Sequence, residues 1–212
     1  GDARVSDDAQ VFGNARVSDN AQVSDDALVY GRAWVFDDAL VFGDALVFSN
    51  ARVSGDAQVY GRARVFDNAW TYGNAQVYGN AHLYGNAQVF GYAQVFGYAY
   101  VYGDAQVYGD AWVHDGARVC GDARVHAPQD ILVIGPIGSE NQWITLARTG
   151  TGHHLNIGCW DGTLDELAAE VDQRAANWPA THRSRWRDEY AAAEQLLRHR
   201  AEAWRNSEGG DQ

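Results

Sequence analysis

The most constraining feature of this chain is a strict six-residue period. Alanine occupies every sixth position from Ala3 to Ala123 without one exception. The position two residues after each alanine is valine, except at Thr71 and Leu83. No insertion or deletion interrupts the series, and a fixed period of this kind indicates a repeat architecture.

The six-residue unit reads as one short strand followed by one corner. In the pattern Ala-x-Val-y, strand alternation places alanine and valine on one face and x and y on the other. The next two residues are often Gly-Asp, Gly-Asn or Asp-Asp, which suit a tight turn because they accept a positive φ. Three equal sides make a coil of 18 residues around a narrow Val/Ala core, so residues 1–126 supply seven coils.

The spacing of an aliphatic residue and a small residue four positions later carries a family resemblance. It recurs at Val5 and Ala9, at Val77 and Ala81, and at Val107 and Ala111. Over residues 1–126 the chain resembles the hexapeptide-repeat, left-handed parallel β-helix family. The left hand is implied by this resemblance alone, since the general preference of crossover connections is right-handed.

The period stops at Ala127, and the remaining chain has mixed character. The segments ILVIGPIG, NQWITLARTG and HHLNIGCW predict three short strands. A capping box of Thr163 and Glu166 predicts the start of a helix that Pro179 ends. Its apolar stripe comprises Leu164, Leu167, Ala168, Val171, Ala175 and Trp178. A second helix is expected over residues 183–204, with an apolar face of Trp186, Tyr190, Ala193, Leu197, Ala201 and Trp204.

The predicted fold class is an all-β solenoid: a triangular left-handed parallel β-helix of about seven coils with a small C-terminal α/β cap. The expected domains are the β-helix over residues 1–126, the cap over residues 127–206 and a frayed tail over residues 207–212. A cap is expected because a solenoid needs a terminal unit over its last coil. This last third is also similar to a module that follows hexapeptide arrays in uncharacterised bacterial and phage proteins, which implies no activity.

Catalysis is not expected in the array. The family that the chain resembles includes many acyltransferases. Those enzymes generally carry corner loops, a catalytic histidine and a groove for an acyl-CoA donor. Here all repeat units have the same length, and a smooth prism offers no concave pocket for chemistry. His82 lies at an outward x position, where an ordinary solvated side chain is expected. No catalytic residue and no cofactor are therefore predicted.

Two groups of residues could hold a metal ion. Stacking by 18 residues places Asp8, Asp26 and Asp44 in one corner column, where oxygen ligands would suit Ca²⁺. A hydrated acidic edge is the preferred interpretation, so the three remain candidates only. His153, His154 and Cys159 are close in sequence, but they lack a fourth ligand. Cys159 is instead expected to be buried in the core of the cap.

The y positions predict aromatic columns on the outside of the solenoid. The longest contains Phe12, Tyr30, Phe48, Phe66, Tyr84 and Tyr102, with Leu28 and Leu46 beside it. A large apolar stripe of this kind usually marks a contact surface. The first coil adds a second candidate interface, because its strand edges and its core valines Val5, Val11 and Val17 are expected to be open to a second coil.

Composition limits the partners. The net charge of -12 and the pI near 4.8 argue against nucleic acid and anionic membranes as ligands. No apolar run is long enough for a membrane span, and two cysteines make no disulfide framework, so a cytoplasmic setting is expected. The sequence predicts a non-enzymatic rigid β-solenoid that acts as a structural or protein-interaction module and self-associates. The alternative is a hexapeptide-family acyltransferase or its degenerate descendant. A mimic of nucleic acid is a third possibility, weakened because the acidic residues cluster in the N-terminal coils.

Overall fold

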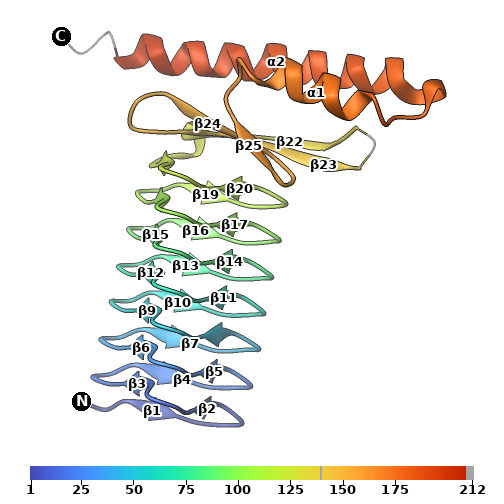
Figure 1. Ribbon diagram of the computed structural model, residues 1–212. Helices are drawn as coiled ribbons and strands as arrows, with labels where there is room; N and C mark the ends of the chain where they lie inside the picture. Colours follow the sequence, from blue (N-terminus) through green and yellow to red (C-terminus); the bar gives the residue numbers. More distant parts are fainter. Residues whose placement is uncertain (139, 209–212) are drawn as a thin grey trace. The chain divides into compact units, whose positions relative to one another are not determined.

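The alanine–valine repeat folds into a parallel β-solenoid of about seven coils (Figure 1). The computed structural model describes residues 1–138 and 140–208. Contacts divide the chain into two compact units, Gly1–Pro128 and Gln129–Gln212. Each coil of the first unit contributes one two-residue strand to each of three seven-stranded parallel sheets.

The strands follow one another around the three sheets in strict rotation. The first sheet contains β1 (Arg4–Val5), β4 (Gln22–Val23), β7 (Leu40–Val41), β10 (Gln58–Val59), β13 (Gln76–Val77), β16 (Gln94–Val95) and β19 (Trp112–Val113). The second contains β2 (Gln10–Val11), β5 (Leu28–Val29), β8 (Leu46–Val47), β11 (Arg64–Val65), β14 (His82–Leu83), β17 (Tyr100–Val101) and β20 (Arg118–Val119). The third contains β3 (Arg16–Val17), β6 (Trp34–Val35), β9 (Arg52–Val53), β12 (Trp70–Thr71), β15 (Gln88–Val89), β18 (Gln106–Val107) and β21 (Arg124–Val125).

The register places each residue against the one 18 positions away, as expected from three equal sides. Val77 pairs with Val59 and with Val95, and its side chain is fully buried. The N–H groups of x and y residues donate to the next coil; that of Gln76, for example, is 2.9 Å from the carbonyl oxygen of Ala93. The strands are shorter than the four residues of the Ala-x-Val-y pattern. The alanine N–H frequently donates instead to the y carbonyl of the preceding unit, within the corner.

The corners explain why glycine or aspartate occupies one position of most repeat units. The first of the two residues in a corner has a positive φ, for example 70° at Gly43 and 58° at Asp25. A Cβ added at Gly43 would lie 2.9 Å from the backbone nitrogen of Gly61 in the next coil. A side chain at this position would therefore point toward the next coil, parallel to the solenoid axis. At Asp7, Asp25, Asp37 and Asp67 a carboxylate oxygen accepts the N–H of the next corner; Asp25 Oδ2, for example, lies 2.9 Å from the nitrogen of Gly43. The aspartate thus offsets the strain of its positive φ with a bond between coils.

The core of the solenoid contains one polar exception. Thr71 replaces valine in β12, is fully buried, and its hydroxyl has no hydrogen-bond partner among the described residues. Its register neighbours are Val53 and Val89. Burying an unsatisfied hydroxyl costs free energy, so the array tolerates this residue at the expense of stability.

The second unit is built on a four-stranded antiparallel sheet. Its strands are β22 (Ile131–Ile137), β23 (Gln142–Arg148), β24 (His153–Ile157) and β25 (Trp160–Gly162), in that order across the sheet. A short 3-10 helix, Pro128–Asp130, precedes them. The sequence predicted three strands, and the third prediction was incomplete. The segment HHLNIGCW turns at Gly158, whose φ is 62°, and returns as the fourth strand.

Two helices pack on this sheet, and both differ from prediction at their ends. Helix α1 (Leu167–Ala175) begins after a turn, because Glu166 folds back to accept hydrogen bonds from the N–H and the hydroxyl of Thr163, each at 2.9 Å. Helix α2 (Ala180–Glu208) begins directly after Pro179 and extends beyond the predicted end at Trp204. It also includes the first part of the tail that was predicted to fray, and residues 209–212 lie outside the described residues.

The predicted helical stripes supply most of the core of this unit. They pack with Ile144, Leu146, Leu155 and Ile157 of the sheet. Ala168 is an exception, because it is exposed. Trp186 is only partly buried. Among the described residues, no helix combines the length and the apolar character needed to cross a membrane.

We expect Thr71→Val to stabilise the protein, because the substitution removes an unpaired buried hydroxyl and leaves a similar shape. The gain in free energy of unfolding should be about 1–3 kcal/mol, visible as a rise in Tm of several degrees in calorimetry. The matched control is Val89→Thr in the neighbouring strand, which should lower Tm. A Tm of Thr71→Val that equals or falls below that of the unmodified protein would contradict this account.

Candidate functional site

The longest aromatic column forms a continuous stack on the outside of the solenoid. We call it the aromatic ladder; it consists of Phe12, Tyr30, Phe48, Phe66, Tyr84 and Tyr102. Neighbouring ring centroids are 4.9–5.0 Å apart and the ring planes differ by 1–6°. Phe12 is 49% exposed, and the other five rings are partly buried. The 18-residue register therefore brings together all six predicted residues.

Shorter stacks follow the other two sheets. One comprises Phe42, Tyr60, Tyr78, Phe96 and His114, and another comprises Tyr72, Phe90, Tyr108 and His126. The hydroxyl groups of Tyr72 and Tyr78 donate to the side-chain oxygens of Gln88 and Gln94, at 3.3 and 3.1 Å. Burial raises the pKa of Tyr72 and of Tyr78, so these phenols stay protonated as donors.

The first coil is less covered than the coils that follow. Val5 is 49% exposed, and Val11 and Val17 are partly exposed. Strands β1, β2 and β3 each pair with one neighbour among the described residues and lie at the edges of their sheets. The corresponding valines of later coils are fully buried.

The acidic corner column lies between the first and second sheets; we call this position the first corner. Its upper part holds an ion pair, in which Nε of Arg62 lies 3.5 Å from Oδ2 of Asp44. Asp25, beside Asp26, uses a carboxylate oxygen for the N–H of Gly43. All three members of the column, Asp8, Asp26 and Asp44, are exposed, and these contacts engage Asp44 and the neighbouring Asp25 within the protein.

His82 is less solvated than the sequence suggested. It points outward from β14, but it is partly buried, and its ring centroid lies 4.8 Å from that of Tyr100. Burial, and then the charge of Arg64, lower the pKa of His82. Among the described residues, no group is hydrogen-bonded to its ring as an orienting partner of the kind that a general base uses.

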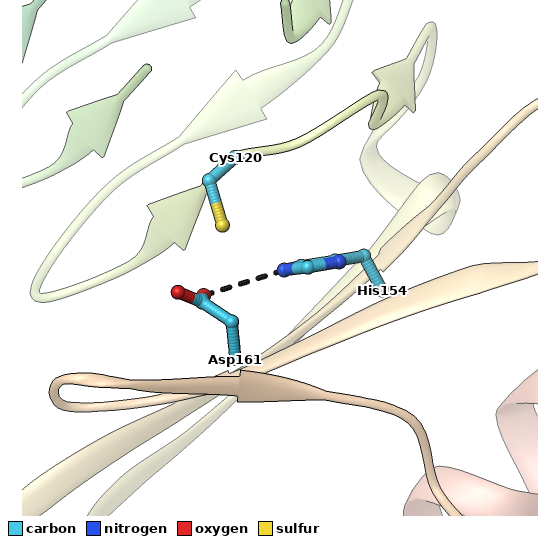
Figure 2. A group of neighbouring side chains, drawn as sticks. All are labelled: Cys120, His154 and Asp161. Carbon is cyan, nitrogen blue, oxygen red and sulfur yellow. Dashed lines mark hydrogen bonds and ion pairs between the residues drawn. The ribbon is translucent and has the colours of Figure 1, made fainter. Parts of the chain in front are cut away.

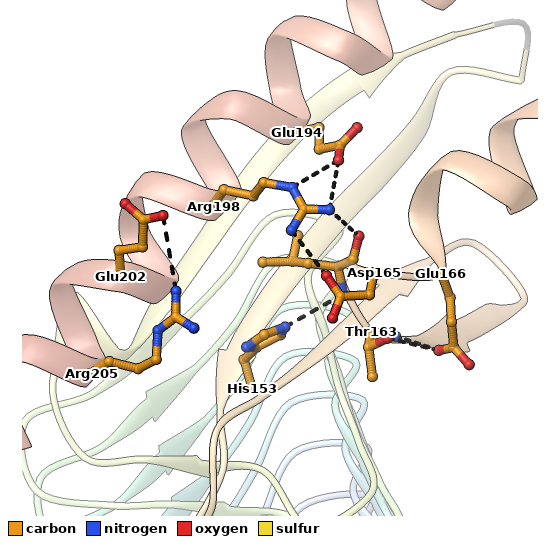
Figure 3. A network of polar contacts seen from close by, with 9 residues as sticks. His153, Thr163, Asp165, Glu166, Glu194, Arg198, Glu202 and Arg205 are labelled. Carbon is orange, nitrogen blue, oxygen red and sulfur yellow. Dashed lines mark hydrogen bonds and ion pairs between the residues drawn. The ribbon is translucent and has the colours of Figure 1, made fainter.

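A polar network in the second unit joins α2 to the turn before α1 (Figure 3). Arg198 donates to Glu194 at 2.8 Å, to the carboxylate of Asp165 at 3.1 Å and to the carbonyl of Leu164 at 2.9 Å. The hydrogen bonds to Glu194 and Asp165 raise the pKa of Arg198. His153 accepts the backbone N–H of Leu164 at 3.4 Å, so its Nε2 carries no proton in this arrangement.

The structure separates the three residues weighed as metal ligands in this unit. His153 contacts the turn before α1, whereas Nε2 of His154 lies 3.3 Å from a carboxylate oxygen of Asp161 in β25 (Figure 2). Cys159 lies in the turn between β24 and β25 and is exposed. The expectation of a buried Cys159 was therefore wrong, because the segment that carries it reverses direction there instead of continuing as one strand.

Sequence reasoning missed a cleft on the second corner, which lies between the second and third sheets. It is lined by Asn14, Arg16, Arg32, Trp34, Asn50 and Arg52. A signal was present in the sequence, since Arg16, Trp34 and Arg52 are 18 residues apart and Arg32 lies two residues before Trp34. Counting charge over the whole chain concealed this basic group within an acidic protein.

The geometry defines a parallel β-solenoid repeat protein. A family model described as the YdcK β-solenoid repeat matches residues 9–21, 21–37 and 57–73. These matches and the seven-coil parallel solenoid fit a hexapeptide-like β-helix family. Comparisons with the curated proteins and with the solved structures gave no match.

We expect His153 to make the second unit less stable in acid. Burial, first, and the nearby Arg205, Arg198 and His154 lower its pKa in the folded protein below the ordinary value of 6.5, against the opposing charge of Asp165. The unfolded chain therefore binds more protons in this range, and stability falls as the pH drops below 6.5 toward the folded pKa.

The measurement is Tm between pH 7.5 and pH 5 for the unmodified protein and His153→Gln, which keeps an acceptor but cannot titrate. The variant should lose about 1–2 °C less over this range. The exposed His199→Gln serves as control and should follow the unmodified protein. Identical pH profiles for all three proteins would show that His153 does not contribute.

Proposed function

We propose that this chain is a non-enzymatic, rigid β-solenoid that acts as a structural and protein-interaction module. The observation that carries the proposal is the aromatic ladder, which presents a stack of parallel rings through six successive coils. Stacking of this kind stabilises neighbouring coils by roughly 0.5–1.5 kcal/mol per pair. A surface that is both apolar and held in register is suited to binding another ordered surface.

The uniform corners support the non-enzymatic part of the proposal. In residues 1–126 every corner consists of two residues, and no loop leaves the array. The acyltransferase resemblance depends on such loops and on a donor groove. The same proposal includes a left-handed winding, as the resemblance implies, and a capping role for residues 127–206. A cytoplasmic setting stays a prediction from the cysteine count.

A second copy of this chain is the partner that we favour for the ladder. Leu28 and Leu46 extend the apolar surface onto β5 and β8, between Gln10 and Arg64. Two identical ladders have the same ring spacing, so a two-fold arrangement could place ring against ring over several coils. The first coil offers another self-contact, because its edge strands could pair with a coil of a second copy or with further residues of a longer chain.

We expect acetyl-CoA to form no complex that depends on His82. Titration calorimetry at millimolar acetyl-CoA should give the same signal for the unmodified protein and for a variant without this histidine, because no loop forms a donor groove beside it in residues 1–126. His82→Ala is the matched variant, since His82 is the histidine that projects from the second sheet. A saturating signal that is lost in His82→Ala would favour the acyltransferase alternative.

We also expect the unmodified protein to form dimers in sedimentation equilibrium. Leu46→Glu should weaken association at least tenfold, because a two-fold contact would place the two new charges close together in an apolar surface. Gln58→Glu makes the same addition at the same repeat position of the first sheet and should leave association unchanged.

Each other result has a definite meaning. If Leu46→Glu leaves the dimer intact and Val5→Lys dissolves it, the contact lies at the first coil. A monomer at all concentrations up to the millimolar range would contradict self-association through either surface.

A further inference from the structure

Three arginines from three successive coils line one cleft on the second corner. The cleft has a volume of about 360 Å³, and its walls also include Trp34, Asn14 and Asn50. It lies entirely within the solenoid. Neither the aromatic ladder nor the first-coil surface includes any of its charged residues.

The repeat itself builds this cleft. Each coil contributes its second corner residue and the x residue two positions later, giving the pairs Asn14 with Arg16, Arg32 with Trp34, and Asn50 with Arg52. The register stacks Arg16, Trp34 and Arg52 in one column of the third sheet. Arg32 belongs to the neighbouring column, at the level of Trp34. Three arginines from three successive coils therefore line the same cleft, and the guanidinium group of Arg52 also lies over the ring of Trp70 in the next coil, 5.9 Å from its centroid.

The charges of these arginines are not neutralised within the described part of the protein. No ion pair joins Arg16, Arg32 or Arg52 to a carboxylate, whereas Arg62 on the first corner is paired with Asp44. The carboxylates of the same coils lie on the other two corners, at Asp2, Asp7, Asp8, Asp19, Asp25, Asp26, Asp37, Asp38 and Asp44. Apart from Arg4 in β1, the lower coils thus separate positive from negative charge, although the whole chain carries -12.

The cleft has one fixed wall. The indole nitrogen of Trp34 donates to the hydroxyl of Ser18 at 3.2 Å, and the ring centroid lies 4.2 Å from that of Phe36. Trp34 is 37% exposed, so part of this held ring faces the solvent. An apolar wall beside like charges reduces their screening by water, which raises the cost of leaving them without a counter-charge.

We propose that this cleft binds a small ligand that carries several phosphate or sulfate groups. The planar guanidinium group forms paired hydrogen bonds with such anions, and it stays charged at any physiological pH. Arg16 and Arg52 are two coils apart, about 10 Å between Cα atoms, with Arg32 between their levels. That spread suits neighbouring anionic groups on one ligand better than a single ion. Asn14 and Asn50 offer amide groups for the ester oxygens or hydroxyls of the same ligand.

The proposal goes beyond the interaction function and does not depend on it. An acidic protein gains nothing from non-specific attraction of anions, since its overall field repels them. Binding at this corner would therefore be local and saturable. It would also weaken with added salt, because the arginines are exposed and screened.

The test is titration calorimetry at low ionic strength with sodium tripolyphosphate, sucrose octasulfate and orthophosphate. We expect one site per chain for a multivalent ligand, and affinity for orthophosphate at least tenfold weaker. Comparison of the first two probes distinguishes a phosphate site from a sulfate-ester site. Absence of saturable binding for both probes would overturn the proposal.

Variants locate the site. Arg32→Gln should weaken binding at least tenfold, and the double variant Arg16→Gln with Arg52→Gln should abolish it. Arg64→Gln is the matched control, because Arg64 is also an exposed arginine and lies at an x position of the second sheet. All three proteins should keep the Tm of the unmodified chain, since the changed side chains are exposed. An equal loss of affinity in Arg64→Gln, or unchanged affinity in the cleft variants, would show diffuse attraction and refute the site.

Discussion

The whole solenoid depends on one constraint, that each coil contains 18 residues and pairs in register with the next. Two N–H groups of each strand unit donate to the adjacent coil, typically at 2.9–3.0 Å. This bonding leaves little freedom in the length of a side, because one extra residue would reverse the inward and outward positions of everything after it. Alanine and valine fill the interior because the narrow core accepts only small and branched side chains close to the axis.

The same register makes every outward position a column of like neighbours. For aromatic residues the column is favourable, and parallel rings result. For amide side chains it is also favourable: Asn50, Asn68 and Asn86 form a hydrogen-bonded series along the second corner. For charged residues such a column is unfavourable, because like charges repel. Three arrangements in the structure reduce this repulsion. Corner aspartates accept backbone N–H groups, Arg62 pairs with Asp44, and the arginines of the second corner face an open cleft.

The sequence predicted the solenoid well because its information is redundant. Any one of the repeat units specifies the phase, so an exception such as Thr71 changes the energy without changing the fold. The columns of the aromatic ladder followed directly from the register. The hand of the coil did not, since the period is the same for either winding.

The second unit was predicted less completely, because its segments are unique. The turn at Gly158 divides a segment that reads as one strand, and no neighbouring repeat reveals it. Helix α1 starts late because Glu166 binds Thr163 before the helix begins. The cleft was missed for a different reason. Its arginines are distant in sequence and become neighbours only when the columns of two adjacent sides are considered together.

The 18-residue register has a consequence for how such an array can change in length. Loss or gain of three units removes or adds one coil and keeps every column intact. Loss of a single unit would preserve the core equally well, since all units present alanine and valine inward. It would, however, turn all later columns by one side of the triangle, so that aromatic rings would meet serines and arginines would meet glutamines. The core is therefore preserved by any change in length that is a multiple of six residues, whereas the surface columns are preserved only by a multiple of 18.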